Sequence, residues 1–367
     1  MRDTFLCDCC HQEHPISQLR TFDGQNLCIT CRNEHTVLCD ECGERIWRSG
    51  DLGDCGIHLC SQCREDYTYC CDCGQLIHVD RLHYLNSNDD EGYCERCYFS
   101  RSSDGVIQSY YYKPEPIFYG EGDRFFGVEL ELDGGGERTD KANQLLSAAN
   151  TSGQELLYIK HDGSLDDGLE LVSHPMTLDF HQQEMPWRLI LQEAIRMDYL
   201  SHQAHTCGLH VHVNRDAFGE TVMEQEEVIA RILFFVENHW NELLRFSRRT
   251  RSQMEQWAAR YGRKDDPKAV LDHAKRHEFE RYKCVNLTNP QTIEFRMFRG
   301  TLKWNTMIAT LQMVDRICDV ALYLSDQDVQ DLTWSDFVAS CTQPELVQYL
   351  KERRLYVNEP VAVGEEV

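Results

Sequence analysis

Alternating apolar and polar residues predict a β-strand with two chemically different faces near the end of the chain. With a period of two, Ile293, Phe295 and Met297 fall on one face of an extended segment. Glu294 and Arg296 fall on the opposite face. Taken alone, this pattern fits either an ion pair on a solvated strand or two functional groups presented together. Other segments of the chain favour the second interpretation.

Two more segments place ionisable side chains on a single strand face. Glu129 and Glu131 alternate with aliphatic residues in the strand predicted at Phe125–Leu132. His210 and His212 alternate with aliphatic residues in the same way. Each pair alone is compatible with a solvent-facing strand or with hydrogen-bonded core histidines. Side by side in one sheet, these faces would gather groups whose burial without partners costs several kcal/mol each, and a bound cation is a natural partner.

Apolar residues at helical spacing predict the elements that surround these strands. The longest such pattern, 221–247, has a continuous buried stripe typical of a core helix. Pro186 is expected to break or kink a helix at 178–198. The other predicted helices are 139–149, 305–324 and 343–353, and further strands are predicted within 158–165, 169–175, 208–213 and 281–287.

Composition and charge limit the class of protein. The chain has 367 residues, and a hydrophobic content of 41% is normal for a soluble protein. Its apolar runs are too short to span a membrane, and the N-terminus leads into cysteines without a signal-peptide core. We therefore expect a cytoplasmic protein with no membrane partner. The formal charge of −24 disfavours nucleic-acid binding, because phosphate recognition requires a basic surface.

Cysteines are concentrated before residue 98, where they form an internal repeat of roughly thirty residues. Of the 19 cysteines, four lie later in the chain. A Cys-x-x-Cys turn presents two thiolates to one cation, and two such turns complete a tetrahedral zinc site. We expect about three structural zinc ions, in a reducing compartment. The predicted zinc ligands are Cys7, Cys10, Cys28, Cys31, Cys39, Cys42, Cys60, Cys63, Cys70, Cys73, Cys94 and Cys97.

The pairing of these turns and the role of the repeats are open from the sequence. Consecutive turns would give zinc ribbons, whereas turns shared between neighbours would give a cross-braced arrangement. Lysine is absent before Lys113, and Asp and Glu outnumber Arg there, so docking of a protein partner or presentation of a substrate is favoured over nucleic-acid binding. Spare or substitute ligands are Cys9, Cys55, Cys71, His11, His35 and His58.

Shifts in composition divide the chain into four segments. Residues 1–99 contain three tandem zinc-ribbon-like repeats. Residues 100–119 have the Ser, Gly and Pro content of a linker. Residues 120–358 form the main domain, and residues 359–367 are expected to be a disordered tail.

Five motifs occur in an order that resembles the amidoligase family, relatives of glutamine synthetase and glutamate–cysteine ligase. The resemblance extends over about residues 120–325 and leaves out the cysteine repeats. It implies an α+β fold in which an antiparallel sheet forms a glutamine-synthetase-like funnel with helices outside it. The motifs are Gly127–Glu131, Lys160–Leu165, Glu170–Ser173, Cys207–Val213 and Val285–Arg296.

The resemblance also implies ATP and two or three Mg²⁺ (or Mn²⁺) ions within the funnel. Carboxylate-rich sites with a minor imidazole component suit these hard cations better than zinc. One ion would be held by Glu129, His210 and Glu294, and another by Glu131 and Glu170.

Further roles follow from the same motif match. His212 would face the nucleotide phosphates, and Arg296 the transferred phosphoryl group. Asp162 and Ser164 would line the substrate side. Arg248 and Arg249 lie in a basic stretch, Arg245–Arg263, which is either a solvated helix end or a clamp for phosphate or carboxylate. The catalytic candidates are Arg296, Asp162 and Glu294, and the nucleotide-binding candidates are His212, Arg296, Arg248, Arg249 and Ser164.

These assignments imply an ATP-dependent carboxylate–amine ligase that forms an amide through an acyl phosphate. Its substrates would be small molecules, or peptides or proteins held by the zinc ribbons. Two alternatives are a zinc-dependent amide hydrolase, with His210 and His212 as ligands and Glu294 as base, and a non-catalytic zinc-ribbon adaptor. The hydrolase leaves Arg296 unexplained, and the adaptor does not account for a complete set of charged motif positions.

Overall fold

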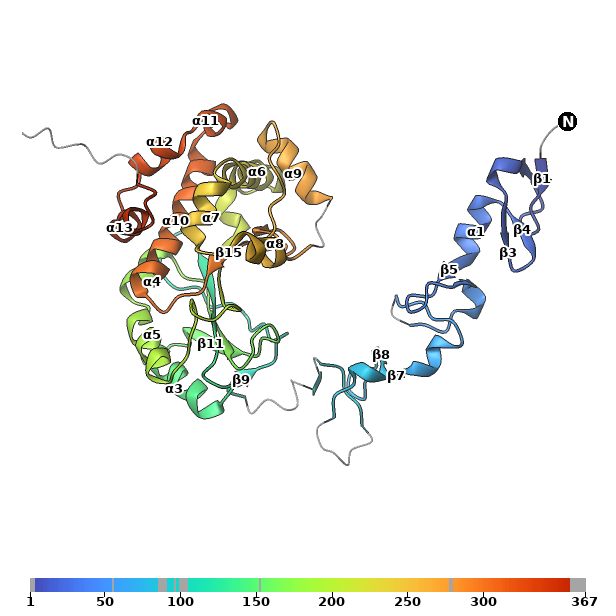
Figure 1. Ribbon diagram of the computed structural model, residues 1–367, viewed down its shortest axis with the longest axis horizontal. Helices are drawn as coiled ribbons and strands as arrows, with labels where there is room; N and C mark the ends of the chain where they lie inside the picture. The colour runs from blue at the N-terminus through green and yellow to red at the C-terminus, as the bar shows by residue number, and fades with distance from the viewer. Residues whose placement is uncertain are drawn as a thin grey trace, which may run out of the picture. The chain divides into compact units, whose positions relative to one another are not determined.

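The chain contains two compact units, Met1–Ser103 and Asp104–Val367 (Figure 1). Three predicted features lie outside the described part of the chain: the tail after residue 358, the spare ligand Cys55 and the first part of the linker, up to residue 104. The computed structural model describes residues 4–54, 56–84, 91–95, 97–98, 105–151, 153–276 and 280–356.

The N-terminal unit repeats one small antiparallel hairpin three times, as β1–β2, β5–β6 and β7–β8. Each of these hairpins turns at a Cys-x-x-Cys sequence. A left-handed residue follows at the same place in each repeat, namely His11, Gly43 and Gly74, and glycine accepts this conformation without strain. The elements are β1 (Thr4–Leu6), β2 (Glu13–Pro15), β3 (Arg20–Phe22), β4 (Gln25–Leu27), α1 (Ile29–His35), β5 (Thr36–Leu38), β6 (Arg45–Trp47), β7 (Tyr67–Tyr69) and β8 (Leu76–His78).

Three groups of four cysteines lie within this unit, and in each group the sulfur atoms lie within 4.8 Å of one another. Each group joins two consecutive Cys-x-x-Cys turns, so the structure selects consecutive pairing over a cross-braced arrangement. Cys9 forms a further group with Cys31 and His35. The three main groups are Cys7, Cys10, Cys28 and Cys31; Cys39, Cys42, Cys60 and Cys63; and Cys70, Cys73, Cys94 and Cys97.

The geometry of these groups fits zinc. Zn–S bonds of about 2.3 Å give a tetrahedron whose edges measure about 3.8 Å. The Cys42 and Cys60 sulfurs are 3.9 Å apart, and the equivalent Cys73 and Cys94 sulfurs are 3.8 Å apart. Every cysteine in the described part of the chain is free of disulfides. Three cysteine-rich groups can therefore hold zinc.

Backbone N–H groups stabilise a thiolate at the first cysteine of each group. The Cys28 N–H donates to the Cys7 sulfur at 3.2 Å. Burial acts to raise the pKa of Cys7, Cys39 and Cys70, but the N–H groups around each sulfur prevail and lower it to about 6. Metal binding requires the deprotonated form, so the backbone of each repeat prepares its cysteines for it.

A seven-stranded sheet forms the centre of the C-terminal unit, in the order β14-β15-β13-β10-β12-β11-β9. Adjacent strands are antiparallel except β11 and the edge strand β9, so the sheet is mixed where the sequence predicts a fully antiparallel one. The edge strand β9 also lies inside the predicted linker. The strands are β9 (Ile107–Gln108), β10 (Phe126–Leu132), β11 (Leu157–Lys160), β12 (Leu169–Ser173), β13 (Gly208–Asn214), β14 (Val285–Asn286) and β15 (Thr292–Arg299).

Helices follow the predicted pattern with one correction. Pro186 separates two helices, as predicted, but the pattern at 221–247 is also two helices, because buried His239 leaves helical geometry to pack against Phe235 and Trp334. The helices are α3 (Thr139–Ala149), α4 (Leu178–Gln183), α5 (Trp187–Arg196), α6 (Val222–Asn238), α7 (Trp240–Ser247), α8 (Arg251–Trp257), α9 (Pro267–Lys275), α10 (Trp304–Tyr323), α11 (Asp326–Asp331), α12 (Trp334–Ala339) and α13 (Pro344–Glu352).

Four of these helices were absent from the predicted pattern: α8, α9, α11 and α12. They have only six to nine residues, so each offers few turns over which a helical pattern can be recognised. Each begins at a side chain that accepts a hydrogen bond from the first turn: Thr250, Asp266, Ser325 and Thr333. Among the described helices, none is long and apolar enough to cross a membrane.

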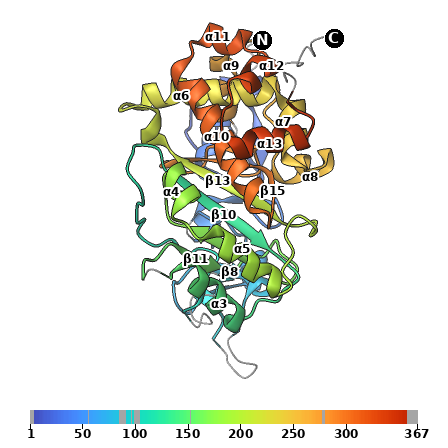
Figure 2. The same cartoon turned by 90° about the vertical axis from the view of Figure 1, so that its left-hand side faces the viewer.

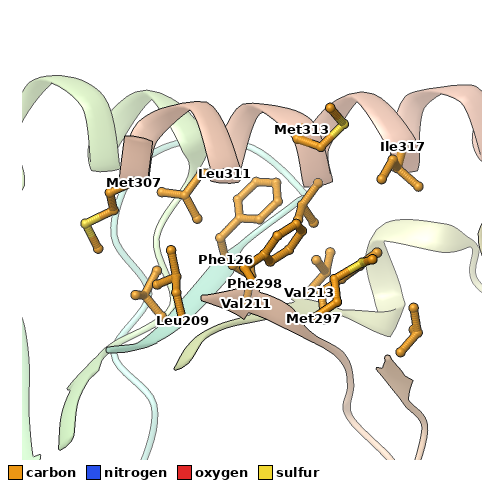
Figure 3. Close-up of a cluster of buried hydrophobic side chains, with 14 of the residues drawn as sticks. Phe126, Leu209, Val211, Val213, Met297, Phe298, Met307, Leu311, Met313 and Ile317 are labelled. Carbon is orange, nitrogen blue, oxygen red and sulfur yellow. The ribbon is translucent and has the colours of Figure 1, made fainter. Parts of the chain in front are cut away.

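The apolar face of the sheet packs against α10 (Figure 3). Met307, Leu311 and Ile317 of α10 lie above Val211 and Val213 of β13, and all are buried. Burying each such side chain contributes about 1.5–3 kcal/mol, so this contact fixes which face of the sheet is turned away from the core. The opposite face carries the ionisable residues.

We predict that removing one zinc ligand lowers the zinc content of the chain by about one ion from a total of about three. Cys42→Ser should cause this loss, because it leaves its group with three sulfurs. Cys71→Ser is the matched control, because Cys71 is an exposed cysteine outside the three groups. Metal analysis of the purified proteins measures the difference, and a chain with almost no zinc and oxidised cysteines would contradict the prediction.

We predict that His181 makes the fold sensitive to acid. Its ring is fully buried, donates to the Phe126 carbonyl at 2.9 Å and accepts from Trp187 at 3.2 Å. Burial lowers its pKa from 6.5 to about 4, so the unfolded chain binds more protons between these values. The contribution of the neutral His181 ring to the free energy of unfolding is fully present above pH 6.5. It falls as the pH drops toward 4, by about 2 kcal/mol at pH 5.

Thermal unfolding of wild type and His181→Gln at several pH values tests this prediction. The glutamine amide retains a donor and an acceptor but does not titrate. The difference in melting temperature between the two proteins should therefore change in favour of the variant as the pH falls. A pH-independent difference would exclude His181 as the titrating group.

Candidate functional site

The polar face of the sheet brings the predicted ionisable residues into one row. Strand alternation places them on this face, and the antiparallel register sets them opposite one another. Glu129 of β10 lies opposite His210 of β13. His212 of β13 lies opposite Glu294 of β15. The second β10 carboxylate and its partner on β12, Glu131 and Glu170, form the next pair along the row.

Glu129, His210 and Glu294 form the centre of this row and could hold a metal ion, because their ligand atoms lie within 4.8 Å of one another. His210 Nδ1 is 3.4 Å from Glu129 Oε2 and 3.6 Å from Glu294 Oε1. His212 Nε2 lies 3.1 Å from Glu129 Oε1. The three residues predicted to bind one ion are thus brought together by three adjacent strands.

Glu131 and Glu170 lie beside this cluster. His210 Nε2 is 3.7 Å from Glu131 Oε1, and the Gly208 N–H donates to the same carboxylate. Lys160 of β11 lies opposite Glu170, with its Nζ 3.6 Å from Glu170 Oε2. The predicted second pair of metal ligands is therefore adjacent to the first set, and both of its carboxylates are buried.

Burial and neighbouring charges shift the pKa values of these carboxylates in opposite directions. Burial acts to raise the pKa of Glu129, but the two imidazoles prevail and hold it well below its usual range. Burial and the neighbouring Glu129 charge raise the pKa of Glu170 well above its usual range. Burial likewise raises the pKa of Glu131. The protein alone does not compensate all of these negative charges, which is the condition under which a divalent cation binds.

Glu294 is held at both of its oxygens. Arg296 Nη1 donates to Oε1 at 2.5 Å, and Asn286 Nδ2 of β14 donates to Oε2 at 2.8 Å. The pairing of β13 and β15 shifts beside it, since β13 advances two residues from Leu209 to Val211 while β15 advances three. This bulge gives β15 one extra residue next to Arg296, and bulges commonly redirect side chains beside active sites.

A cleft opens above the row, and several of the predicted site residues line it. Asp162 and Ser164 come from the turn after β11, where the Ser164 N–H donates to Asp162 Oδ1 at 2.8 Å. Other polar groups come from β10, β13, β15 and the loops around them. The lining residues are Glu131, Asp162, Ser164, Thr206, His210, Arg249, Trp257, Arg281, Tyr282 and Arg296.

The two arginines predicted together are separated by the structure. Arg249 is buried and lines both the cleft and a neighbouring groove, whereas Arg248 lines that groove and not the cleft. Burial lowers the pKa of the Arg249 guanidinium, although the Glu131 charge opposes this effect. Arg249 therefore lines the same cleft as candidate metal ligands, and Arg248 does not.

Sequence reasoning missed five residues that shape the site. Lys160 and Asn286 lie within the family motifs and on the polar strand faces, so strand alternation was the signal that could have identified them. Arg281 and Tyr282 belong to the strand predicted within 281–287, but the strand begins only at Val285, so these two residues lie in an irregular segment before β14. The Arg281 guanidinium donates to the Tyr110 hydroxyl at 2.6 Å, a contact across 171 residues that local sequence does not reveal.

Comparison with solved structures gives a weak likeness to a bifunctional glutathione synthetase from Pasteurella multocida. The sequence identity is 13% and the TM-score is 0.35, over 63% of this chain. This chain spans about half the length of that protein, 46%. We base no conclusion on so distant a likeness.

Comparison of the sequence with known families gives a clearer result. No curated protein matches the chain. The family model described as "Putative amidoligase enzyme" matches residues 131–318, which is just over half of the chain and includes most of the row and the cleft. The chain therefore belongs to the amidoligase family.

Proposed function

We propose that this chain is an ATP-dependent ligase that joins a carboxylate to an amine through an acyl phosphate. The observation that carries the proposal is the convergence of buried carboxylates, imidazoles and two arginines on one sheet face in a member of the amidoligase family. We also propose that the sheet is of the glutamine-synthetase type, with the row as the inner surface of the funnel.

The donor set fits Mg²⁺ or Mn²⁺. Glu129, His210 and Glu294 would hold one ion, and Glu131 with Glu170 a second. Oxygen-rich sites favour these hard cations, whereas soft thiolates favour zinc, so the two units of the chain would bind different metals. When bound, such ions compensate phosphate charge and orient the phosphates for displacement.

The reaction requires ATP because a carboxylate does not react with an amine at neutral pH. One carboxylate oxygen attacks the γ-phosphorus of ATP, a new P–O bond forms and ADP leaves. The amine then attacks the acyl carbon, the C–N bond forms, and phosphate leaves with the oxygen. The residues of this chain would keep the groups aligned and exclude water, which would otherwise hydrolyse the acyl phosphate.

Five residues of the row and the cleft would act in these steps. Arg296 would stabilise charge on the transferred phosphoryl group, and His212 would face the nucleotide phosphates. Asp162 and Ser164 would face the substrates, where the Asp162 carboxylate can accept the proton that the amine loses. Arg249 would add a second guanidinium to the same cleft.

Two alternatives use fewer of these groups. A zinc hydrolase built on His210 and His212 gives no task to Arg249 and Arg296, which line the same cleft. A non-catalytic adaptor gives no reason for burying several carboxylates at a cost of several kcal/mol each. The proposed ligase gives a task to the arginines, the imidazoles and the buried carboxylates. The zinc ribbons would hold a protein or peptide substrate.

We predict that nucleotide binding depends on the central carboxylates. Calorimetry should show that wild type binds ATP when Mg²⁺ or Mn²⁺ is present. Glu129→Gln and Glu294→Gln should weaken this binding and reduce ligation by about 10²–10³-fold, because phosphate charge is left uncompensated. Glu227→Gln is the control, since Glu227 is exposed on α6. Hydrolysis of amides with zinc, without any nucleotide binding, would favour the hydrolase instead.

We predict that Arg296→Lys impairs phosphoryl transfer while the fold remains intact. Lysine keeps the charge but lacks the planar fork that contacts two oxygens at once, so ATP turnover should fall by about 10²-fold. ADP release in the presence of candidate acids and amines measures the effect, and a thermal melt checks the fold. Unchanged turnover would mean that Arg296 is a structural ion-pair partner of Glu294.

A further inference from the structure

Six arginines line a groove of about 820 Å³ beside the cleft. We call it the arginine groove. It is formed by α7, the turn after it, the start of α8, the end of β15 and the end of α13, which lie close together in Figure 2. The arginines are Arg245, Arg248, Arg249, Arg251, Arg299 and Arg353.

The arginine groove has an uncompensated positive charge. Within the described residues, no carboxylate oxygen lies within 4.0 Å of any of the six guanidinium groups. Glu242 is the one acidic residue in the lining. By contrast, Arg124 elsewhere in the unit pairs with two aspartates, at 2.5 and 2.9 Å. The chain as a whole has a formal charge of −24, so a cluster of arginines without ion-pair partners is an exception. Its positive charge favours the binding of an anionic ligand.

Hydrogen bonding leaves these arginines partly unsatisfied. Arg248 and Arg299 each have a buried Nε with no partner in the described part of the chain. Arg353 is held by the Arg245 carbonyl, at 2.8 and 3.0 Å, which is an uncharged acceptor. Buried donors without acceptors are costly, and carboxylates placed in the groove would supply the missing acceptors.

The backbone at the bottom of the groove is strained. Arg248 adopts a left-handed conformation with φ 63° and ψ 9°, between α7 and α8. This conformation costs a non-glycine residue about 1 kcal/mol or more, and such strain persists where a site depends on it. Both Arg248 and Arg249 line the groove at this strained turn, and Arg249 alone also reaches the cleft.

Arg249 connects the arginine groove to the cleft, because it lines both. Its side chain is buried, and its Nε donates to the Phe298 carbonyl at 3.3 Å. The Arg249 side chain also passes so close to Gly208 that a Cβ atom added to this glycine would lie 2.4 Å from Arg249 Nη2. A ligand lying along the groove therefore ends next to the candidate metal ligands.

We propose that the arginine groove binds an acidic peptide segment, the part of the substrate next to the carboxylate that is joined to the amine. This inference rests on the proposed function. Several guanidinium groups spread along a groove suit several carboxylates spaced along an extended chain better than a single anion. Extended nucleic acid is disfavoured, because a polyanion longer than the groove would also lie against the strongly acidic remainder of the chain, whereas a short acidic segment can remain among the arginines.

The test is equilibrium binding of a fluorescein-labelled short oligoglutamate peptide to the full-length chain, measured by fluorescence anisotropy without ATP. The test variant is the double substitution Arg245→Gln and Arg251→Gln, because both side chains are exposed and lie outside the cleft. The control is Arg138→Gln with Arg196→Gln, which changes the net charge equally at exposed positions elsewhere. The matching oligoglutamine peptide controls for non-electrostatic binding.

We expect wild type and the control to bind oligoglutamate with salt-dependent affinity, and the groove variant to bind at least about tenfold more weakly. Oligoglutamine should not bind. Equal binding to all three proteins, or no binding to wild type, would overturn the proposal. Displacement of the peptide by ATP together with weaker ATP binding to the groove variant would also overturn it, because the groove would then be the nucleotide site.

Failure of the proposed function is distinguishable from failure of this inference. The first is measured by metal-dependent nucleotide binding at Glu129 and Glu294, and the second by peptide binding without nucleotide. A chain that binds the peptide in the groove but no nucleotide would retain the groove as an acidic-peptide site and lose the ligase assignment.

Discussion

Burial of carboxylates on one face of the sheet is the constraint on which the rest of the C-terminal unit depends. Glu131, Glu170 and Glu294 are each no more than 5% exposed. Removing an ionised carboxylate from water costs several kcal/mol, so each needs compensation from its surroundings. The structure supplies imidazole, ammonium, amide and guanidinium groups from neighbouring strands. These polar contacts require the strands to pair in one register, because a slip of one residue would turn each carboxylate toward the apolar core.

Burial of apolar side chains on the opposite face of the sheet offsets the cost of burying these carboxylates. Phe126, Val211 and Phe295 are buried beneath the helices on the opposite side of the same strands. Their burial determines which side chains point away from the core, and the antiparallel register then sets Glu129 opposite His210. Packing and electrostatics thus specify the same geometry from two faces of one sheet, which is the consistency expected of a sequence that encodes a single fold.

Charge is distributed unevenly in this acidic chain, and the distribution separates its binding surfaces. The row contains carboxylates and imidazoles suited to hard cations. The cysteine groups contain thiolates suited to zinc. The arginine groove contains unpaired guanidinium groups suited to anions, and Arg249 lies at its junction with the cleft. A ligase must bring metal ions, phosphates and a carboxylate together, so surfaces of opposite charge that meet at one arginine agree with the proposed chemistry.

Local patterns in the sequence determined most strands of the sheet, most long helices, the cysteine repeat and the family, because each depends on residues close together in the chain. Period-two alternation placed Glu294 and Arg296 on the polar face. It would also have placed Phe298 there, but the bulge in β15 turns Phe298 into the core. The assignment of Glu129, His210 and Glu294 to one ion came from the family resemblance, and the structure brings these residues together.

Only the tertiary structure decided which arginine enters the cleft, which cysteine turns pair, and how Tyr110 meets Arg281. Arg248 and Arg249 are adjacent in sequence and share the arginine groove, but beside the left-handed Arg248 only Arg249 also reaches the cleft. The cysteine pairing and the contact between Tyr110 and Arg281 join residues far apart in the chain. Such relations depend on strand register, loop geometry and packing, which are properties of the whole fold that no local pattern of residue types contains.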